Sequence, residues 1–258
     1  MTNVCILASG SKGNAIYVSN GTTCILIDAG LPGIEIERRL RSRNINPHAL
    51  DAIVVSHEHT DHIHGVGVLS RRFQLPVYIN EPTLAAAKTQ LGPLHETRLF
   101  NRGDTFCIGG LCVRPFSVCH DAIDPVGFTI QNSRTKIGIA TDLGIPTKLV
   151  CHHLKECTLV ILEANHDLKM LEEGPYPWPV KQRIRSRLGH LSNEASRDLL
   201  SEISHDGLMQ VILAHISETN NDPNRVTSVV GEAVSHSPTQ LSIAHQHVAG
   251  DMINIDDD

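Results

Sequence analysis

The chain has 258 residues, of which 41% are hydrophobic and 19% are charged, and this composition excludes an intrinsically disordered protein. Its 22 Lys and Arg against 28 Asp and Glu give a net charge of −6, which counts against a protein that coats nucleic acid non-specifically. The 16 histidines are an excess that metal binding or proton transfer would explain.

From the sequence pattern we expect neither a targeting signal nor a membrane anchor. No run approaches the roughly 18 apolar residues that a membrane span needs. The start, MTNVCILASG, has neither a charged n-region nor a proper h-region, so we expect no signal peptide. The seven cysteines form no CxxC pair, and several lie in apolar runs. We therefore expect buried thiols in a reducing cytoplasm, and neither a zinc finger nor a disulfide scaffold.

The apolar pattern predicts strands and helices that are interleaved along the whole chain. A hairpin comes first, with strands 15–19 and 22–27 on either side of the two-residue turn Asn20-Gly21. A helix follows from Pro32 to about residue 43, and 51–56 (DAIVVS) is a short apolar strand that leads into a polar loop. Later strands are expected at 76–80, 98–100, 105–108, 111–116, 126–131, 136–140, 158–163, 210–214 and 240–244. Later helices are expected at 65–73, 81–91, 180–188, 193–203 and 225–234.

The same pattern predicts a single domain. No linker rich in Pro, Gly or Ser divides the chain, and no sequence repeat is visible. We expect one α/β domain over residues 1–258, with helices covering two packed sheets. Residues 246–258, which end in Asp256, Asp257 and Asp258, are expected to form a loosely ordered acidic tail.

The densest group of candidate functional residues is His57-Glu-His-Thr-Asp-His62. His57 and His59 lie two apart just after a strand, so an extended backbone places both rings on one side. Asp61 and His62 follow after a tight turn and can face a second ion. Imidazole and carboxylate are ligands that zinc favours, and manganese or iron also accept them. The string is not HExxH, because position 61 is Asp. Its alternative interpretation is a solvated polar loop.

A site with two metal ions needs further ligands, and single residues that follow predicted strands can supply them. His120 ends PFSVCH, Asp142 follows KIGIAT, and His215 follows QVILA. These three bring the set to seven, and the carboxylate of Asp142 is able to bridge both ions. His64 is interpreted as a surface residue or a support for the ligands. The strings Cys151-His152-His153 and His245-Gln246-His247 are interpreted as structural.

These ordered motifs resemble the metallo-β-lactamase superfamily, whose sequence carries HxHxDH, a single His, a single Asp and a final His. The match runs from Asp28 in LIDAG to His215. The resemblance implies a four-layer αββα sandwich with the metals at the edge of the sheets. It also implies two divalent metal ions. His57, His59 and His120 would hold the first ion; Asp61, His62 and His215 would hold the second, with Asp142 bridging.

Particular positions narrow the resemblance to one branch. Asp142 stands where true β-lactamases of this fold have Cys, and His59 stands where flavodiiron members have Glu. LAHIS at 213–217 and GHLS at 189–192 are similar to motifs of the phosphodiesterase branch. The longer segments LASGSKGNAIYV, HDAIDPVGF, LEANHDLKML, GPYPWPVKQRI and LAHISETNNDP resemble the bacterial YycJ/WalJ-type family. This resemblance implies a 5′→3′ exonuclease that acts on DNA rather than RNA.

Two divalent ions about 3.5–4 Å apart are able to share a hydroxide that attacks phosphorus in line with the departing sugar oxygen. Asp61 could ligate an ion and also accept the proton of this nucleophile. His190 lies outside the ligand set and would orient the phosphate or protonate the leaving oxygen. The alternative interpretation of His190 is a histidine at a helix N-terminus, beside the cap at Ser192.

Two further segments are candidates for substrate contact. The turn Ser9-Gly10-Ser11-Lys12-Gly13-Asn14 could present backbone N–H groups, hydroxyls and an ammonium to a phosphate, with Ser9, Ser11 and Asn14 as the contacts. Ser192 is a fourth candidate contact. The Pro- and aromatic-rich stretch 174–179, followed by the basic run Lys181 to Arg187, could bind a nucleic acid strand. The alternatives are a solvated turn and the wet face of a helix.

Two other functions compete with the DNA exonuclease. The same ions could hydrolyse a thioester, a lactone or a small phosphodiester. The chain could also be a non-catalytic binding module that the metals stabilise, although the presence of a ligand at every motif argues against it.

Overall fold

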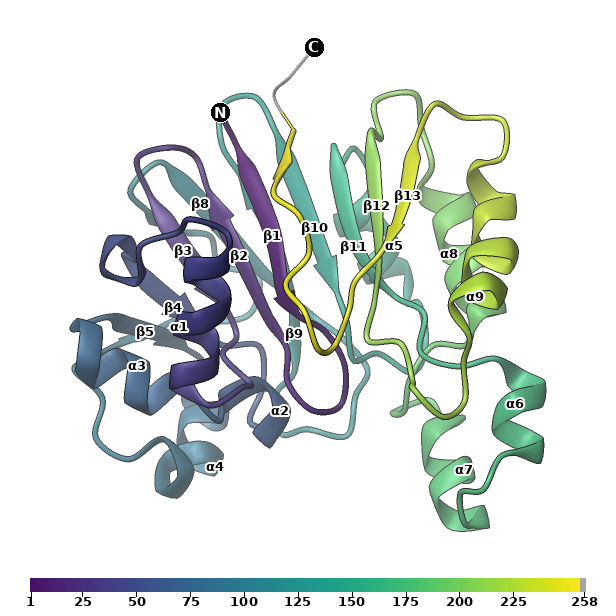
Figure 1. Ribbon diagram of the computed structural model, residues 1–258, viewed down its shortest axis with the longest axis horizontal. Coiled ribbons are helices and arrows are strands. Elements are labelled where there is room, and N and C mark those ends of the chain that lie inside the picture. Colours follow the sequence, from purple (N-terminus) through teal and green to yellow (C-terminus); the bar gives the residue numbers. More distant parts are fainter. Residues whose placement is uncertain (256–258) are drawn as a thin grey trace.

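The computed structural model describes residues 1–255, which form two mixed β-sheets packed face to face (Figure 1). In spatial order, the first sheet contains β14 (Ile253–Asn254), β1 (Asn3–Ala8), β2 (Ala15–Ser19), β3 (Cys24–Ile27), β4 (Ala52–Val54), β5 (Pro76–Ile79) and β6 (Glu96–Leu99). The second contains β13 (Gln240–Ile243), β12 (Gln210–Ala214), β11 (Leu159–Glu163), β10 (Lys136–Ala140), β9 (Val126–Gln131), β8 (Leu111–Ser117) and β7 (Phe106–Ile108).

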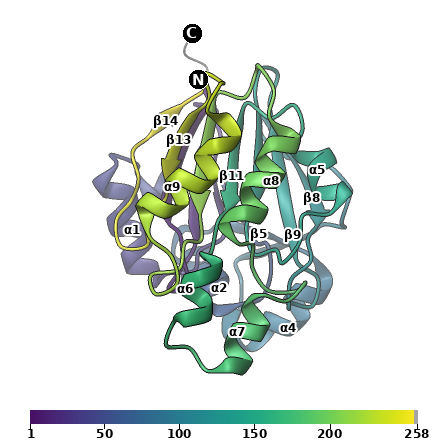
Figure 2. The same ribbon diagram turned by 90° about the vertical axis from the view of Figure 1, so that its right-hand side faces the viewer.

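Helices cover the outer face of each sheet. The first sheet carries α1 (Gly33–Ser42), α3 (Val66–Phe73) and α4 (Glu81–Leu91), and the second carries α5 (Lys148–Leu154), α8 (Asn193–Ile203) and α9 (Pro223–Gly231) (Figures 1 and 2). The short helices α2 (Thr60–Ile63), α6 (Leu168–Glu173) and α7 (Trp178–Ile184) lie toward one edge of the sheets. Two 3₁₀ turns, Pro47–Ala49 and Glu232–Val234, complete the helical elements of residues 1–255. The predicted four-layer αββα sandwich is confirmed.

Both faces of the central strands are buried, which explains why their sequences read as continuous apolar runs. In β1, Val4 and Ile6 point into the core between the two sheets, whereas Cys5 and Leu7 point toward the helices. A third cluster lies between the second sheet and its helices. Within residues 1–255, no helix has the length and apolar character needed to cross a lipid bilayer.

Parallel pairing determines where the loops gather. Strands β3 to β6 are parallel to one another, and so are β10 to β13. The carboxyl ends of β3 and β4 therefore lie at one edge of the first sheet. The carboxyl ends of β10, β11 and β12 lie together at an edge of the second.

Several expected elements differ in the structure. The first hairpin has a four-residue loop, because the Asn20 side chain accepts hydrogen bonds from the N–H groups of Thr22 and Thr23. Helices α5 and α6 were not expected, although the side chains of Thr147 and Asp167 cap their first turns. The helix expected at 180–188 begins and ends earlier, at Trp178 and Ile184.

The expected loose tail is wrong for residues 246–255. Strand β14 pairs with β1, the Ile255 N–H donates to the carbonyl of Thr2, and the Ile255 side chain is buried. Ile253 and Ile255 pack against the core between the sheets, and the burial of this apolar area stabilises the segment. Asp256, Asp257 and Asp258 lie outside the described residues.

The cysteines also differ in part from the expectation of free thiols. A disulfide joins Cys107 on β7 to Cys112 on β8 across a tight hairpin. Cys5, Cys151 and Cys157 are free and buried, as the apolar runs around them predict.

Candidate metal centre

The candidate functional residues follow the carboxyl ends of strands from both sheets. Asp28 follows β3, Asp142 follows β10, and His215 follows β12. These three residues adopt left-handed backbone conformations, with φ of 59°, 56° and 54°. Such conformations cost free energy in residues other than glycine and occur where a site fixes the side-chain direction. The strand ends therefore turn these side chains toward a common point.

The segment after β4 combines an extended stretch with one turn of helix. The rings of His57 and His59 lie 4.7 Å apart between centroids, so the extended backbone places them side by side. His59 is the N-cap of α2, whose first turn carries Asp61 and His62 back toward the same centre. The string therefore folds as its spacing predicts.

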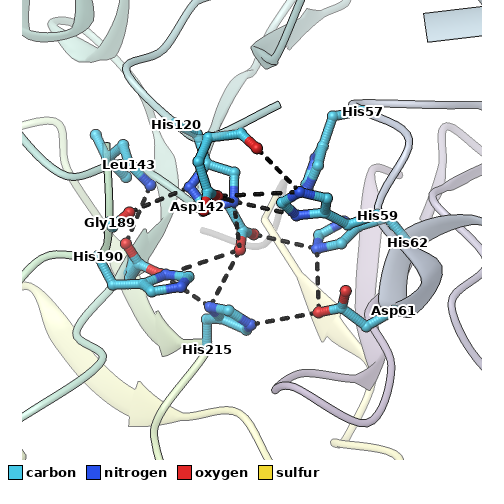
Figure 3. Close-up of polar contacts among 12 residues, drawn as sticks. His57, His59, Asp61, His62, His120, Asp142, Leu143, Gly189, His190 and His215 are labelled. Carbon is cyan, nitrogen blue, oxygen red and sulfur yellow. Dashed lines mark hydrogen bonds and ion pairs between the residues drawn. The ribbon is translucent and has the colours of Figure 1, made fainter. Parts of the chain in front are cut away.

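The structure brings all the predicted metal ligands together (Figure 3). They fall into overlapping groups whose ligand atoms lie within 4.8 Å of one another. One group comprises His57, His59 and His120, and a second comprises Asp61, His62 and His215. Asp142 lies between them, with Oδ2 3.2 Å from His62 Nε2 and Oδ1 3.9 Å from His120 Nε2.

Asp28 fixes the orientation of the histidines on the first sheet. Its Oδ2 lies 2.8 Å from Nδ1 of His62 and accepts a hydrogen bond from the Ser56 hydroxyl. The same hydroxyl lies 2.9 Å from Nδ1 of His57. Because each Nδ1 is engaged in this way, Nε2 of both rings is left to face the centre.

His59 and His120 are supported by backbone carbonyls. Nε2 of His59 lies 3.2 Å from the Asp121 carbonyl oxygen, and Nδ1 of His120 lies 3.1 Å from that of Gly189. The nitrogens that remain, His59 Nδ1 and His120 Nε2, lie 3.3 Å apart. These four predicted histidine ligands thus have one nitrogen supported and the other directed at the cluster, which is the usual arrangement of metal-binding histidines.

Glu163, at the end of β11, supports the residues from the second sheet. It is fully buried, and its Oε1 lies 2.8 Å from Nδ1 of His215 and 2.7 Å from Nδ1 of His190. Its Oε2 accepts hydrogen bonds from the N–H groups of Leu143 and Leu191. Burial opposes its charge, yet the adjacent His190 and His215 hold the pKa of Glu163 at about 2.

Three buried ligand atoms have no hydrogen-bond partner among the described residues: His57 Nε2, Asp142 Oδ2 and His215 Nε2. A buried polar atom without a partner is costly, so its presence in several copies around one point needs a ligand to explain it. A divalent ion accepts lone pairs from imidazole nitrogen and carboxylate oxygen. The residues present therefore fit divalent metal ions.

The charges within the cluster are tightly coupled. Burial opposes protonation of His62, yet the carboxylates of Asp142 and Asp28 hold its pKa well above the usual value. Burial likewise opposes protonation of His215, and Asp142 raises its pKa in the same way. For His57, burial together with the neighbouring His62 lowers the pKa well below the usual value. The carboxylates of the cluster therefore favour positive charge next to these two rings, which a divalent ion would supply.

Exposure identifies the open side of the cluster. The side chains of His59, Asp61 and His190 are 29%, 23% and 18% exposed, whereas those of His62 and Asp142 are 0% and 4% exposed. A substrate therefore reaches the cluster on the side where these three residues lie.

His190 lies beside a helix cap and also next to the cluster. Ser192 is the N-cap of α8, and its hydroxyl accepts a hydrogen bond from the Ala195 N–H. His190 precedes this cap, and its ring points toward the cluster beside His215 (Figure 3). With its Nδ1 held by Glu163, His190 directs Nε2 away from that support.

The glycine-rich turn mainly supports the site from within. The Ser9 hydroxyl accepts from the His215 N–H, and the Asn14 amide lies 3.3 Å from Asp61 Oδ2 and 3.0 Å from His62 Nε2. The backbone N–H groups of Gly10, Lys12, Gly13 and Asn14 are already bonded within the protein, so the expected cradle of free N–H groups is wrong. Ser11 is exposed.

Residues that were interpreted as structural lie apart from the cluster. His64 is exposed at the end of α2, and His153 stacks on Phe116 behind the second sheet. His247 pairs with Glu218 on the surface. None of these histidines belongs to a metal-competent group within residues 1–255.

Sequence reasoning missed two buried carboxylates. Asp28 was noted only as part of a motif, and Glu163 was not assigned any role. A signal was available in both cases, because each acid ends an apolar strand (CILID and LVILE), where an unpaired charge would be costly. The supporting carbonyls of Asp121 and Gly189 carry no signal in the side-chain pattern.

The chain is similar to known proteins over most of its length. A family model described as a β-lactamase superfamily domain matches residues 23–216. Exodeoxyribonuclease YycJ of Bacillus anthracis is 38% identical over 218 residues, covering 84% of this chain and 83% of the relative. Exodeoxyribonuclease WalJ of Streptococcus pneumoniae is 37% identical over 220 residues, covering 84% and 82%.

A solved structure agrees with the fold. The metallo-β-lactamase fold protein YhfI from Bacillus subtilis superimposes with a TM-score of 0.76 at 17% sequence identity. The match covers 97% of this chain and 100% of YhfI. At this identity the similarity supports the architecture alone.

Proposed function

This chain belongs to the YycJ/WalJ family of the metallo-β-lactamase superfamily, and on that premise we propose that it is a dinuclear metal-dependent phosphodiesterase that degrades DNA from the 5′ end. The proposal extends the exodeoxyribonuclease activity of its relatives to this chain. The observation that carries it is the cluster in which five histidines direct one nitrogen each, with Asp61 and Asp142, at a shared centre. DNA is favoured over RNA because the relatives are named for it.

The ligands divide naturally between two ions. His57, His59 and His120 would hold one, and Asp61, His62 and His215 the other, with Asp142 bridging. Bound divalent ions make water nucleophilic at neutral pH and neutralise the charge of the attacked phosphate. We favour zinc for this histidine-rich set, with manganese or iron as alternatives.

Side chains of the protein would accept the proton of the attacking water and position the phosphate. Asp61 lies on the open side, where its carboxylate is able to accept a proton from the attacking water. The Asn14 amide, 3.3 Å from Asp61 Oδ2, holds that carboxylate in place. Ser11, exposed at the tip of the glycine-rich turn, is the remaining candidate for a direct phosphate contact.

His190 is the proposed acid. Its Nδ1–H is donated to Oε1 of Glu163 at 2.7 Å, which fixes the orientation of the ring. Nε2 is then free to protonate the sugar oxygen that leaves phosphorus. Ser192 would act on the site only through His190, because its side chain caps the start of α8 directly after that residue.

The direct test uses DNA labelled at one end. Protein loaded with zinc, manganese or iron is incubated with a 5′-phosphorylated duplex that carries a label at either the 5′ or the 3′ terminus. A 5′→3′ exonuclease releases the 5′ label at once as a mononucleotide, and shortens the 3′-labelled strand progressively. Immediate release of the 3′ label would reverse the proposed direction. Intact DNA and RNA with every metal would overturn the nuclease.

Variants separate the site from contaminating activity. Asp61→Asn is expected to abolish cleavage, whereas His64→Ala is the matched control because His64 adjoins the cluster yet is exposed outside it. Parallel assays with lactoylglutathione and an aryl phosphodiester test the other reactions of this fold. Rapid hydrolysis of the thioester with no action on either phosphodiester would favour the competing function.

A further inference from the structure

The segment between Glu163 and His190 forms a projection that the catalytic scheme leaves unused. We define the α6–α7 lobe as residues 168–188, which contain α6, α7 and the turn that leads to Gly189. The lobe extends beyond the body of the sandwich at the edge where α2 also lies (Figures 1 and 2). Helix α7 has no buried residue, so this part of the lobe adds nothing to the core.

The charge of the lobe is opposite to that of the whole chain. Residues 168–188 carry five cations, Lys169, Lys181, Arg183, Arg185 and Arg187, against the two acids Glu172 and Glu173, although the chain carries a net charge of −6. Arg185 and Arg187 are exposed, and no carboxylate within residues 1–255 forms an ion pair with either. Their charges are therefore available to a polyanion.

The lobe also exposes apolar surface that packing does not explain. Trp178, the single tryptophan of the chain, is 60% exposed, and Leu188 is 51% exposed. Trp178 begins α7, and Arg185 and Arg187 follow its end. An exposed aromatic ring and unpaired cations on one short segment are the combination that binds single-stranded nucleic acid, because every base has a face that can stack. In a duplex the bases are already stacked, so a single strand suits an exposed indole better.

The C-terminal end of α7 is attached to the residues of the candidate metal centre. Arg183 Nε donates to Asp121 Oδ2 at 2.5 Å, and the carbonyl of Asp121 supports His59. Gly189, just beyond the lobe, supports His120 through its backbone carbonyl. The Lys181 ammonium donates to the Glu172 carbonyl and so joins α7 to α6. A strand bound on the lobe would therefore be held at a fixed position relative to the open side of the cluster.

We propose that the α6–α7 lobe is a binding platform for single-stranded DNA, on which Trp178 stacks against a base while Arg185 and Arg187 bind backbone phosphates. The inference rests on the proposed function, because it supplies the polymer contact that distinguishes a DNA substrate from a small phosphodiester. The platform holds the strand while the metal cluster cleaves it.

Binding is measured directly on the metal-loaded protein. A phosphorothioate oligo(dT), which resists cleavage, is expected to quench the emission of Trp178. A labelled oligo(dT) followed by anisotropy then compares variants. Trp178→Ala should weaken binding roughly 5- to 160-fold, and Trp178→Phe should restore most of the affinity. Arg185→Ala with Arg187→Ala should reduce the slope of log affinity against log salt by about 1.4.

Matched variants lie on the other side of the molecule. Ile34→Ala removes an apolar side chain that is 67% exposed on α1, and Arg41→Ala removes an exposed cation from the same helix. Both should bind oligo(dT) as the wild type does. Hydrolysis of a small aryl phosphodiester should be unchanged in all of these variants, which also shows that the metal cluster has kept its form.

The outcomes separate the two proposals. Wild-type affinity for oligo(dT) in both Trp178→Ala and the double arginine variant would overturn the platform, even if the wild type degrades DNA. Equal quenching by a blunt duplex would overturn the preference for a single strand. Binding that depends on the lobe in a protein that cleaves no DNA would support the platform and overturn the exonuclease.

Discussion

Two buried carboxylates support the candidate metal centre, one from each sheet, and they differ in the residues that they contact. Asp28, after β3, contacts Nδ1 of His62 and accepts from the backbone and side chain of Ser56. Glu163, at the end of β11, contacts Nδ1 of both His215 and His190. Asp28 thus fixes proposed metal ligands only, whereas Glu163 fixes a metal ligand and the proposed acid.

This difference reflects how the two sheets supply the residues of the site. The first sheet supplies a compact string of ligands on one loop, and a single carboxylate beneath it is sufficient support. The second sheet supplies separate residues from several loops, and Glu163 links them by accepting N–H groups from Leu143 and Leu191 as well. Loss of Glu163 should therefore damage the reaction more than loss of Asp28.

Glu163→Gln tests the larger of the two roles. The amide has one acceptor oxygen in place of two, so it cannot accept from both imidazoles and also from the N–H groups of Leu143 and Leu191. His190 therefore loses its fixed orientation, or His215 its support. Turnover on DNA should fall about 10²- to 10⁴-fold, the range typical of a lost acid catalyst. Steady-state kinetics with metal analysis measure both effects, and Glu232→Gln on the surface is the control. Wild-type turnover in Glu163→Gln would contradict the comparison.

His190→Ala separates the acid from the ligands. The departing sugar oxygen of DNA needs a proton, whereas a nitrophenolate leaves without one. Cleavage of DNA should therefore fall about 10²- to 10⁴-fold, while hydrolysis of bis(p-nitrophenyl) phosphate falls much less. Metal content should stay at the wild-type value. Equal losses on the two substrates would assign His190 to metal binding or phosphate positioning instead.

Asp28→Asn tests the smaller role. The amide no longer orients His62 as a carboxylate does, so affinity for the metal should fall about 10- to 100-fold. Turnover should return toward the wild-type value when metal is supplied in excess. Competition with a fluorescent chelator gives the affinity. If excess metal fails to restore turnover, Asp28 supports the reaction as Glu163 does, and the two carboxylates are equivalent.

The same division explains what the sequence could predict. On the first sheet, one strand and one turn determine the geometry of His57 to His62, so residue spacing alone predicts which side chains meet. On the second sheet, His120, Asp142 and His215 were identified because each follows an apolar strand. Their convergence depends on the order of β8 to β12, and residue spacing contains no information on strand order.

The backbone groups that support the histidines could not be predicted from the sequence, for a different reason. The carbonyls of Asp121 and Gly189 hold two histidines, and every residue type has a carbonyl, so no residue type marks the role. The interior hydrogen bonds of the glycine-rich turn were missed likewise, because its N–H groups bond to Asp61 and Gln246, which are distant in sequence. The αββα layers were predictable for two reasons. The apolar pattern predicts strands interleaved with helices, and the resemblance of the motifs to the metallo-β-lactamase superfamily implies the four layers.

His153 shows what burial does to the pKa of a histidine when no carboxylate supports it, and so serves as a comparison for His62 and His215. His153 is 8% exposed and stacks on Phe116 with ring centroids 4.8 Å apart. Burial and the adjacent Arg114 lower its pKa from 6.5 to about 4, whereas carboxylates raise the pKa of His62 and His215. Neutral His153 is therefore the form that the fold accepts.

The consequence for stability is small but has a definite sign. Between pH 6.5 and pH 4, the unfolded chain binds a proton at His153 that the folded chain does not. The free energy of unfolding should therefore fall as the pH falls through this window. His153→Gln removes the titrating group, so its urea midpoint should fall less than that of the wild type between pH 7.5 and pH 5. Both proteins keep the same metal ligands, so metal loss at low pH cancels in the comparison. Identical pH dependence in the two proteins would show that burial away from carboxylates leaves a histidine free to protonate.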